Sequence, residues 1–155
     1  MNSNELLITE TNFNKLKNKV KEAKLKEKIV IYSSEDDDLN RKAIDKLEID
    51  ILLINQTNRK DFQKQRNSGF NQVMAKIAKK RNTKIGINLD EIIDSNFIKE
   101  KSEILARVKQ NIFLCKKNNI KMKFITQKKK NERKIHDLKS FGLILGMPTS
   151  MTKNL

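Results

Sequence analysis

Four consecutive acidic residues, Glu35-Asp36-Asp37-Asp38, follow an apolar run that ends at Tyr32. Hard divalent cations prefer carboxylate oxygens as ligands, so this group could hold such an ion. Acidic residues in a first helical turn also complement the helix dipole, and Ser34 followed three residues later by Asp37 is close to a capping box. The acidic group is therefore either a cation site or the start of a helix.

The residue types that most other catalytic sites require are scarce. His136 is the only histidine, so a histidine-based metal site or a Ser-His-Asp arrangement is not indicated. Cys115 is the only cysteine, which excludes an internal disulfide, and its spacing from Ile112 predicts packing within a helix. The four glycines form no Walker or Rossmann pattern. We expect no catalytic residue, no metal ligand and no cofactor bound by the protein.

Basic residues give the stronger functional signal. The chain has 34 Lys and Arg against 19 Asp and Glu, and residues 99–155 hold 15 of the basic but only 4 of the acidic residues. Three basic sets stand out, on segments 66–81, 99–118 and 127–134, and together they could neutralise several phosphates in a salt-sensitive way. With seven Phe, one Tyr and no Trp, base stacking on an exposed platform is not expected. The composition favours backbone and shape contacts to structured RNA.

The segment 66–81 is the best-formed helix of the sequence. Its apolar residues recur with a helical period and form one stripe: Phe70, Val73, Met74, Ile77 and Ala78. Ser68 is the predicted N-cap, and Gly69 allows the backbone to bend into the helix. The residues off the stripe form a cationic, hydrogen-bonding face, and they are Arg66, Asn71, Lys76, Lys79, Lys80 and Arg81.

Strands and helices alternate along the chain. Short apolar runs predict strands at 6–9, 28–32, 49–54, 84–88 and 120–126, and helical periodicity predicts helices at 13–23, 36–47, 69–81, 99–118 and 135–145. This alternation predicts an α/β fold with parallel strands, either a flavodoxin-like sheet or an incomplete (βα) barrel. In both folds ligands bind beyond the carboxyl ends of the strands, which here are segments 33–38, 55–67, 88–94 and 127–133.

Length and hydropathy set the broad class of the protein. A chain of 155 residues is expected to form one domain, which we place at 1–148 with a short C-terminal tail at 149–155. No apolar run approaches the roughly 20 residues of a membrane span, and the first ten residues lack the pattern of an export signal. A single cysteine fits a reducing compartment, so we expect a cytoplasmic protein.

Three stretches, taken together, resemble one known family. Their residues match that family in order and spacing: Leu39–Ile44 with Ile49–Leu53, Arg59-Lys60-Asp61 through Ser68–Lys76 followed by Ile85–Ile87, and Ile104–Asn111 with Leu114-Cys115, ending in Leu143–Met147. The sequence resembles ribonuclease P protein component 3, the archaeal and eukaryotic barrel-like protein subunit of ribonuclease P. The match extends from about residue 29 to 147.

The resemblance implies a shortened or incomplete TIM-like (β/α) barrel that binds ribonuclease P RNA and helps it remove the 5′ leader of precursor tRNA. It implies that the RNA performs the chemistry with its own magnesium, and that a small ferredoxin-like protein subunit joins this chain in a heterotetramer. Matching family positions are candidates for contacting RNA or for fixing loops that face it: Arg41, Lys60, Asn71, Lys76, Arg107 and Asn111. Charge adds further RNA-binding candidates: Arg66, Lys128, Lys129, Lys130 and Arg133.

Two other functions stay open. The first is a stand-alone metal-dependent phosphoesterase on a related barrel, which would use the acidic residues after Tyr32. The second is a flavodoxin-like signalling domain with Asp36 as an acceptor, against which the net charge of +15 argues. The family usually has Ser-Gly-Ala after the last strand, whereas this chain has Thr126-Gln127-Lys128 and then a basic loop.

Overall fold

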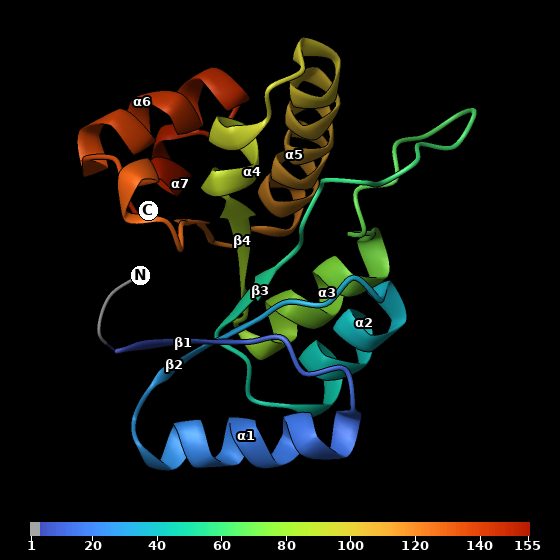
Figure 1. Cartoon of the computed structure of the whole chain (residues 1–155), viewed down its shortest axis with the longest axis vertical. Helices are drawn as coiled ribbons and strands as arrows, with labels where there is room; N and C mark the ends of the chain where they lie inside the picture. Colours follow the sequence, from blue (N-terminus) through green and yellow to red (C-terminus); the bar gives the residue numbers. More distant parts are fainter. Residues whose placement is uncertain (1–3) are drawn as a thin grey trace.

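The computed structural model describes residues 4–155, in which strands and helices alternate (Figure 1). The strands are β1 (Glu5–Ile8), β2 (Ile29–Tyr32), β3 (Ile51–Leu53), β4 (Lys84–Asn88) and β5 (Met122–Ile125). The helices are α1 (Phe13–Leu25), α2 (Asp37–Lys46), α3 (Gln72–Arg81), α4 (Leu89–Asp94), α5 (Ile98–Asn118), α6 (Ile135–Leu145) and α7 (Thr149–Thr152). A short 3-10 helix, η1 (Lys129–Asn131), follows β5.

The strand order decides between the two predicted α/β folds. All strand pairs are parallel and the five strands lie in the order β1-β2-β3-β4-β5. A flavodoxin-like sheet has its first strand inside the sheet, because the chain reverses direction after it. A sequential order instead is that of a barrel built strand by strand. The sheet is therefore the incomplete TIM-like barrel, and the flavodoxin-like alternative is wrong.

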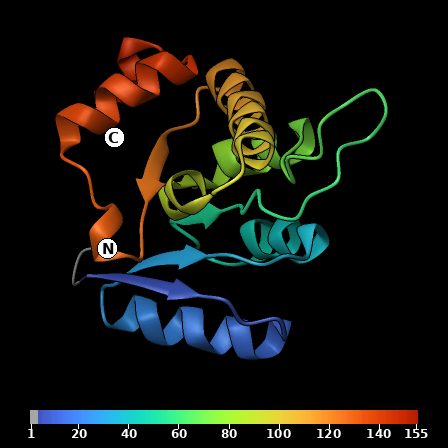
Figure 2. The same cartoon turned by 45° about the horizontal axis from the view of Figure 1, so that its top comes forward.

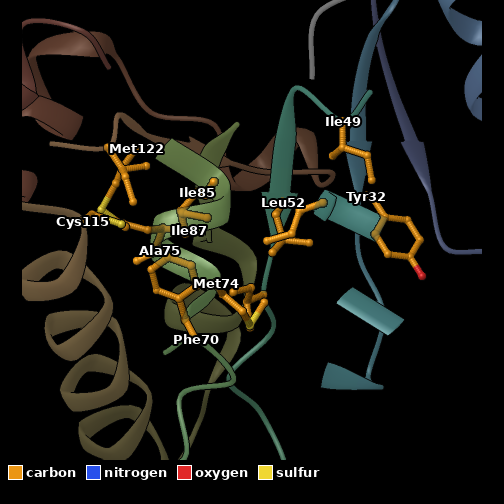
Figure 3. Packing of buried hydrophobic residues seen from close by; sticks show 14 of the residues in the cluster. Tyr32, Ile49, Leu52, Phe70, Met74, Ala75, Ile85, Ile87, Cys115 and Met122 are labelled. Carbon is orange, nitrogen blue, oxygen red and sulfur yellow. The ribbon is translucent and has the colours of Figure 1, made fainter. Parts of the chain in front are cut away.

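Both faces of the sheet are buried, which explains why its strands read as unbroken apolar runs. The larger core lies between the sheet and the helices, and Leu52, Met74 and Cys115 are among its members (Figure 3). Cys115 is fully buried in this core, which confirms its predicted packing role, and burial raises the pKa of its thiol. A smaller cluster fills the other face and consists of Ile31, Ile51, Leu53 and Ile125, with Leu7 packed against it.

One ion pair connects the two ends of the sheet. Glu5 on β1 accepts a hydrogen bond from the ammonium group of Lys123 on β5. The Glu5 side chain is almost fully buried, and its charge is matched by this ammonium group. The pair therefore draws the first and last strands toward each other at the edge where the strands begin.

Two predictions for the helix in segment 66–81 are wrong. Helix α3 begins at Gln72, and its N-cap is Asn71, whose side chain accepts a hydrogen bond from the Met74 N–H at 3.0 Å; Ser68 lies outside the helix. Val73, predicted for the apolar stripe, is 48% exposed. Two short helices were not predicted: α4 lies in the strand-end segment 88–94, and α7 lies in residues 149–155, where Met151 is buried.

Candidate nucleic-acid interface

A long connection leaves the carboxyl end of β3 and projects from the rest of the molecule (Figures 1 and 2). We call residues 55–71 the arm. Its base is fixed by Gln56, whose side-chain amide donates to the carbonyl oxygens of Ile54 and Ser68, each at 3.0 Å. The backbone N–H groups of Gln56 and Thr57 donate to the Glu91 carboxylate at 2.8 and 3.0 Å. Both ends of the arm are therefore held at the strand-end edge of the sheet.

Arg107 of α5 holds the middle of the arm. Its side chain is 3% exposed, and Nε donates to Asp61 Oδ1 at 2.8 Å. The two terminal nitrogens donate to the carbonyl oxygens of Gln56 at 3.0 Å and Arg59 at 2.8 Å. The Arg107 guanidinium also lowers the pKa of the Asp61 carboxyl below its ordinary value. Arg107 was a candidate for contacting RNA or for fixing a loop, and its buried donors hold the arm.

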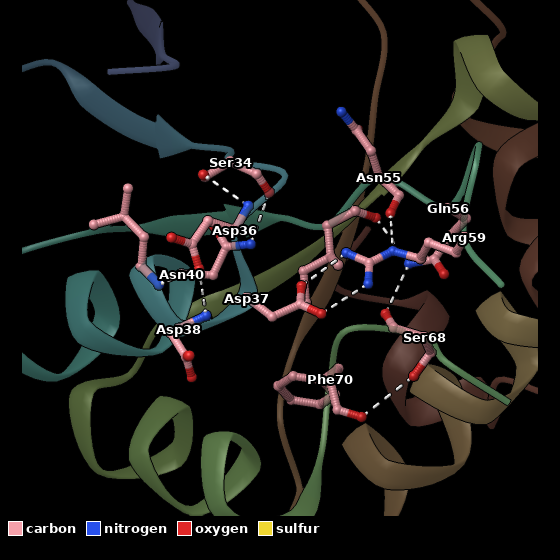
Figure 4. Close-up of polar contacts among 12 residues, drawn as sticks. Ser34, Asp36, Asp37, Asp38, Asn40, Asn55, Gln56, Arg59, Ser68 and Phe70 are labelled. Carbon is pink, nitrogen blue, oxygen red and sulfur yellow. Dashed lines mark hydrogen bonds and ion pairs between the residues drawn. The ribbon is translucent and has the colours of Figure 1, made fainter. Parts of the chain in front are cut away.

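The acidic group after β2 also contributes to the arm (Figure 4). The Arg59 guanidinium forms a two-pronged ion pair with Asp37, with N···O distances of 2.9 and 2.8 Å. Asp36 is the N-cap of α2 and accepts from the N–H groups of Asp38 and Leu39 at 2.9 and 3.1 Å. The capping box predicted around Ser34 is therefore wrong in its N-cap residue, although the helix-start interpretation is confirmed.

No cation site is built by this acidic group. Among residues 4–155, no three His, Cys, Asp or Glu side chains are grouped as ligands of one metal ion. The roles just described, capping α2 and pairing with the arm, account for Asp36 and Asp37. The geometry thus gives no support to the phosphoesterase alternative.

Helix α4 anchors a second basic segment, residues 126–134, which we call the basic loop. The Asp90 carboxylate accepts from the Thr126 hydroxyl at 2.6 Å, the Gln127 N–H at 2.8 Å and the Asn131 side-chain amide at 2.8 Å. Four residues on, Asp94 forms an ion pair with Lys128 at 2.5 Å. Since Glu91 of the same helix holds the arm, α4 fixes the arm and the basic loop relative to each other.

The anchoring of the basic loop should weaken in acid. The pKa of Asp94 falls from its ordinary value of 3.8 to about 2, chiefly because of the Lys128 ammonium group. Burial acts to raise the pKa of Asp90, but its hydrogen bonds outweigh burial and lower it. A carboxyl whose pKa is lower in the folded state stabilises that state above its unfolded pKa, and the contribution disappears as pH falls through the folded pKa. The loop should therefore lose this stabilisation as pH falls from about 4 to 2.

The measurement is the free energy of unfolding as a function of pH, for the wild type and for the double variant Asp90→Asn, Asp94→Asn. The variant should be less stable at neutral pH and should lose less stability between about pH 4 and 2. Equal losses in the two proteins would show that these carboxylates do not hold the loop.

The predicted RNA-binding residues fall into two groups. Most of them are exposed side chains on α2, the arm, α3 and the basic loop: Arg41, Lys60, Arg66, Lys76, Lys128, Lys129, Lys130 and Arg133. Asn71 is also exposed, but its oxygen caps α3. Arg107 and Asn111 are buried within the molecule, at 3% and 4% exposure. The exposed group could contact a polyanion directly, whereas Arg107 acts by shaping the arm.

Sequence reasoning missed the residues that fix the two basic segments. Arg59 lies in a stretch that resembles the family, but only the neighbouring Lys60 was predicted to contact RNA or to fix a loop. Asp90 and Glu91 did carry one, because two acidic residues follow a predicted strand at the edge where ligands bind. Gly69 was linked only to a helix start, but it has φ +68°, and a Cβ there would lie 2.4 Å from an Arg59 nitrogen.

The fold and these segments can be compared with known proteins. A family model described as RNase P subunit p30 matches residues 4–155. The chain belongs to the RNase P subunit p30 family. The resemblance inferred from three sequence stretches is confirmed.

A solved structure supports the p30 fold. The chain is similar to a chain in the cryo-EM structure of archaeal ribonuclease P with mature tRNA, with a TM-score of 0.80 and 23% sequence identity. The match covers 97% of this chain and 62% of the other, so this chain spans about three fifths of that protein. No curated protein sequence matches it. Among residues 4–155, no helix has the length and apolar character that a membrane span requires.

Proposed function

We propose that this p30-family chain is an RNA-binding protein subunit of ribonuclease P, which assists the catalytic RNA in removing the 5′ leader of precursor tRNA. The observation that carries the proposal is the shared anchoring of two basic segments by α4, because it presents exposed lysines in fixed positions at one edge of the sheet. Such an arrangement suits phosphate backbones whose spacing is set by a folded RNA.

The partners follow from the same proposal. Ribonuclease P RNA is the direct partner, and precursor tRNA is bound within the assembled enzyme. The RNA performs the reaction with its own magnesium, and the chain supplies no catalytic residue and binds no cofactor. We propose that the protein is located in the cytoplasm. A reducing compartment keeps the Cys115 thiol free, and the proposed substrate, precursor tRNA, would be present there.

A protein partner is part of the proposal as well. We place a small ferredoxin-like ribonuclease P subunit beside this chain, in a heterotetramer. Large apolar side chains that face solvent on α5 and α6 support a protein contact, and the most exposed are Ile98, Ile144 and Phe113.

Reconstitution tests the function directly. Cleavage of precursor tRNA is measured with ribonuclease P RNA of the same organism, magnesium and the small protein subunit, with and without this chain. We expect cleavage at moderate salt to require the chain, and we expect the protein alone to be inert. Cleavage by the protein alone would contradict the proposal and would favour the phosphoesterase alternative.

Salt dependence tests the proposed surface. The triple variant Lys60→Gln, Lys76→Gln, Lys129→Gln removes three exposed charges that form no ion pair within residues 4–155. The RNA-binding constant K falls as salt rises, and each lost phosphate contact makes the slope of log K against log salt less steep by roughly 0.7 to 0.9. The magnitude of the slope should therefore decrease by about 2 to 3 in the triple variant. The matched control replaces Lys17, Lys21 and Lys26 on and just after α1 with glutamine. Equal slopes in the two variants would show that binding follows net charge and not this surface.

A further inference from the structure

Phe62 occupies the tip of the arm and faces solvent. Its side chain is 59% exposed, and its backbone N–H donates to the Gln65 carbonyl at 2.9 Å, which closes a tight turn. The preceding residue, Asp61, is held by Arg107 at 2.8 Å and accepts the Asn67 N–H at 2.9 Å. The residue before the exposed ring is thus fixed by a partly buried ion pair, so the position of the ring does not depend on the loop alone.

The ring lines a polar cleft of about 370 Å³. This volume is at the lower end of the roughly 300 to 1,000 Å³ typical of sites for small ligands. Its other walls come from α2, from the start of α3, and from α5 and the arm itself, and its polar side chains include Arg41, Arg66, Gln72 and Gln110. The cleft is therefore formed by segments that meet only in the folded protein.

The walls of this cleft have fixed positions. The side-chain amide of Gln110 on α5 donates to the Ser68 hydroxyl at 3.1 Å and to the Arg66 carbonyl at 3.3 Å. The acidic side chains that line the cleft are Asp37 and Asp38; Asp37 is neutralised by Arg59, and Asp38 stays exposed at the start of α2. Arg66 shares the Asp61 carboxylate with Arg107, at 3.1 and 2.8 Å. Because one carboxylate serves two guanidinium groups, the cleft keeps a net positive charge from Arg41 and Arg66.

These groups match the parts of a nucleotide. An aromatic face stacks on any base, side-chain amides form hydrogen bonds with base edges, and guanidinium groups bind phosphate. Bases inside a duplex are stacked on each other and paired, so such a cleft suits a nucleotide that stands out of a loop or bulge. The exposed lysines on both sides of Phe62, Lys60 and Lys64, favour a polyanion over an apolar protein segment.

We propose that this cleft binds one unpaired nucleotide of RNA, with its base stacked on Phe62 and its phosphate on Arg41 and Arg66. The inference rests on the proposed RNA-binding function and adds a base-contacting site to a surface otherwise described by phosphate contacts. It also revises the sequence-based expectation, which disfavoured base stacking because aromatic residues are scarce.

Fluorescence reports on stacking without any activity measurement. The chain has no tryptophan, so Phe62→Trp introduces a single indole at the tip of the arm. We expect its emission to be quenched when ribonuclease P RNA is added, because a stacked base quenches indole. The matched control is Phe113→Trp on α5, a similarly exposed position (65%) outside the cleft, which should not be quenched. Quenching equal to that of the control would overturn the proposal.

Affinity separates stacking from charge. Phe62→Leu keeps an apolar side chain but removes the ring, and base stacking is worth about 1 to 3 kcal/mol, so RNA affinity should fall roughly 5- to 150-fold. The slope of affinity against salt should stay unchanged, and Phe62→Tyr should bind like the wild type. Phe97→Leu, at the start of α5, is the control for loss of an exposed ring.

The outcomes distinguish this site from the function on which it rests. Unchanged affinity of Phe62→Leu, together with the reduced salt slope of the triple lysine variant, would overturn the nucleotide site and leave the RNA-binding function in place. If neither variant changed binding, both proposals would fail. Quenching of the Phe62→Trp indole by the small protein subunit without RNA would show that the cleft takes a protein and would also overturn the site.

Discussion

Replacing Arg107 with methionine should destabilise the protein by about 3 kcal/mol and detach the arm. Methionine fills much of the same volume but offers no donor, so Asp61 and the carbonyls of Gln56 and Arg59 lose the hydrogen bonds that the guanidinium supplies. Removing one partner of a buried ion pair destabilises by roughly 3 to 5 kcal/mol. Asp61 is 24% exposed and can recover some hydration, which places the effect at the low end.

Urea unfolding measures this change, and hydrogen exchange of the arm locates it. Lys109→Met is the matched control, because Lys109 is exposed on the same helix two residues further on. That control should change stability by less than about 0.5 kcal/mol. If the two variants were equally stable, the contacts of Arg107 with the arm would not contribute to stability. RNA affinity should also fall in Arg107→Met, because the proposed nucleotide cleft includes the arm.

Gly69→Ala should destabilise the protein by roughly 2 to 4 kcal/mol, for two separable reasons. Its φ of +68° lies in the left-handed region, where an L residue is strained by about 1 to 2 kcal/mol. In addition, the new methyl group would lie 2.4 to 2.6 Å from the Arg59 guanidinium. Arg59 must then move and give up its paired hydrogen bonds to Asp37.

Two comparisons separate strain from collision. Gly146→Ala introduces an alanine at φ +102° with no atom within 4 Å of the new Cβ, so it should show backbone strain alone. In an Arg59→Ala background the collision is absent, and the effect of Gly69→Ala should shrink to about 1 to 2 kcal/mol. Calorimetry or urea unfolding of the four proteins of this cycle provides the measurement. If Gly69→Ala destabilised the Arg59→Ala protein as much as the wild type, a collision with Arg59 would not contribute to its effect.

The architecture links these stabilising contacts to the proposed function. Arg59 connects the arm to α2, Arg107 connects it to α5, and Glu91 connects it to α4. Asp90 of α4 holds the basic loop. Segments that follow β2, β3, β4 and β5 thus form one hydrogen-bonded layer at the carboxyl edge of the sheet, so a change in any anchor should move basic side chains that lie far from it in sequence.

The amino-acid sequence by itself determined the order of elements, the parallel sheet and the family. The spacing of apolar residues along the chain indicates which positions are buried, and this signal depends only on nearby residues. Apolar runs such as 28–32 predicted strands, and the spacing of Ile112 and Cys115 predicted a packed helix face. It also determined the basic character of the strand-end segments. Periodicity alone left the flavodoxin-like and barrel orders equally open, since both contain the same alternation.

Tertiary structure decided which polar residues are structural. Arg107 sits among the basic residues of its helix, but its partners lie 46 to 51 residues earlier in the chain. The helical period of a sequence cannot distinguish an arginine that is exposed to solvent from one that donates to the carbonyl oxygens of a loop. Only folding brings those acceptors close to the arginine. The same reason applies to α4 and to Phe62: their roles depend on segments that local sequence does not place beside them. The physical origin of the difference is that apolar burial is patterned locally, whereas each buried polar group needs a particular partner, which only the fold supplies.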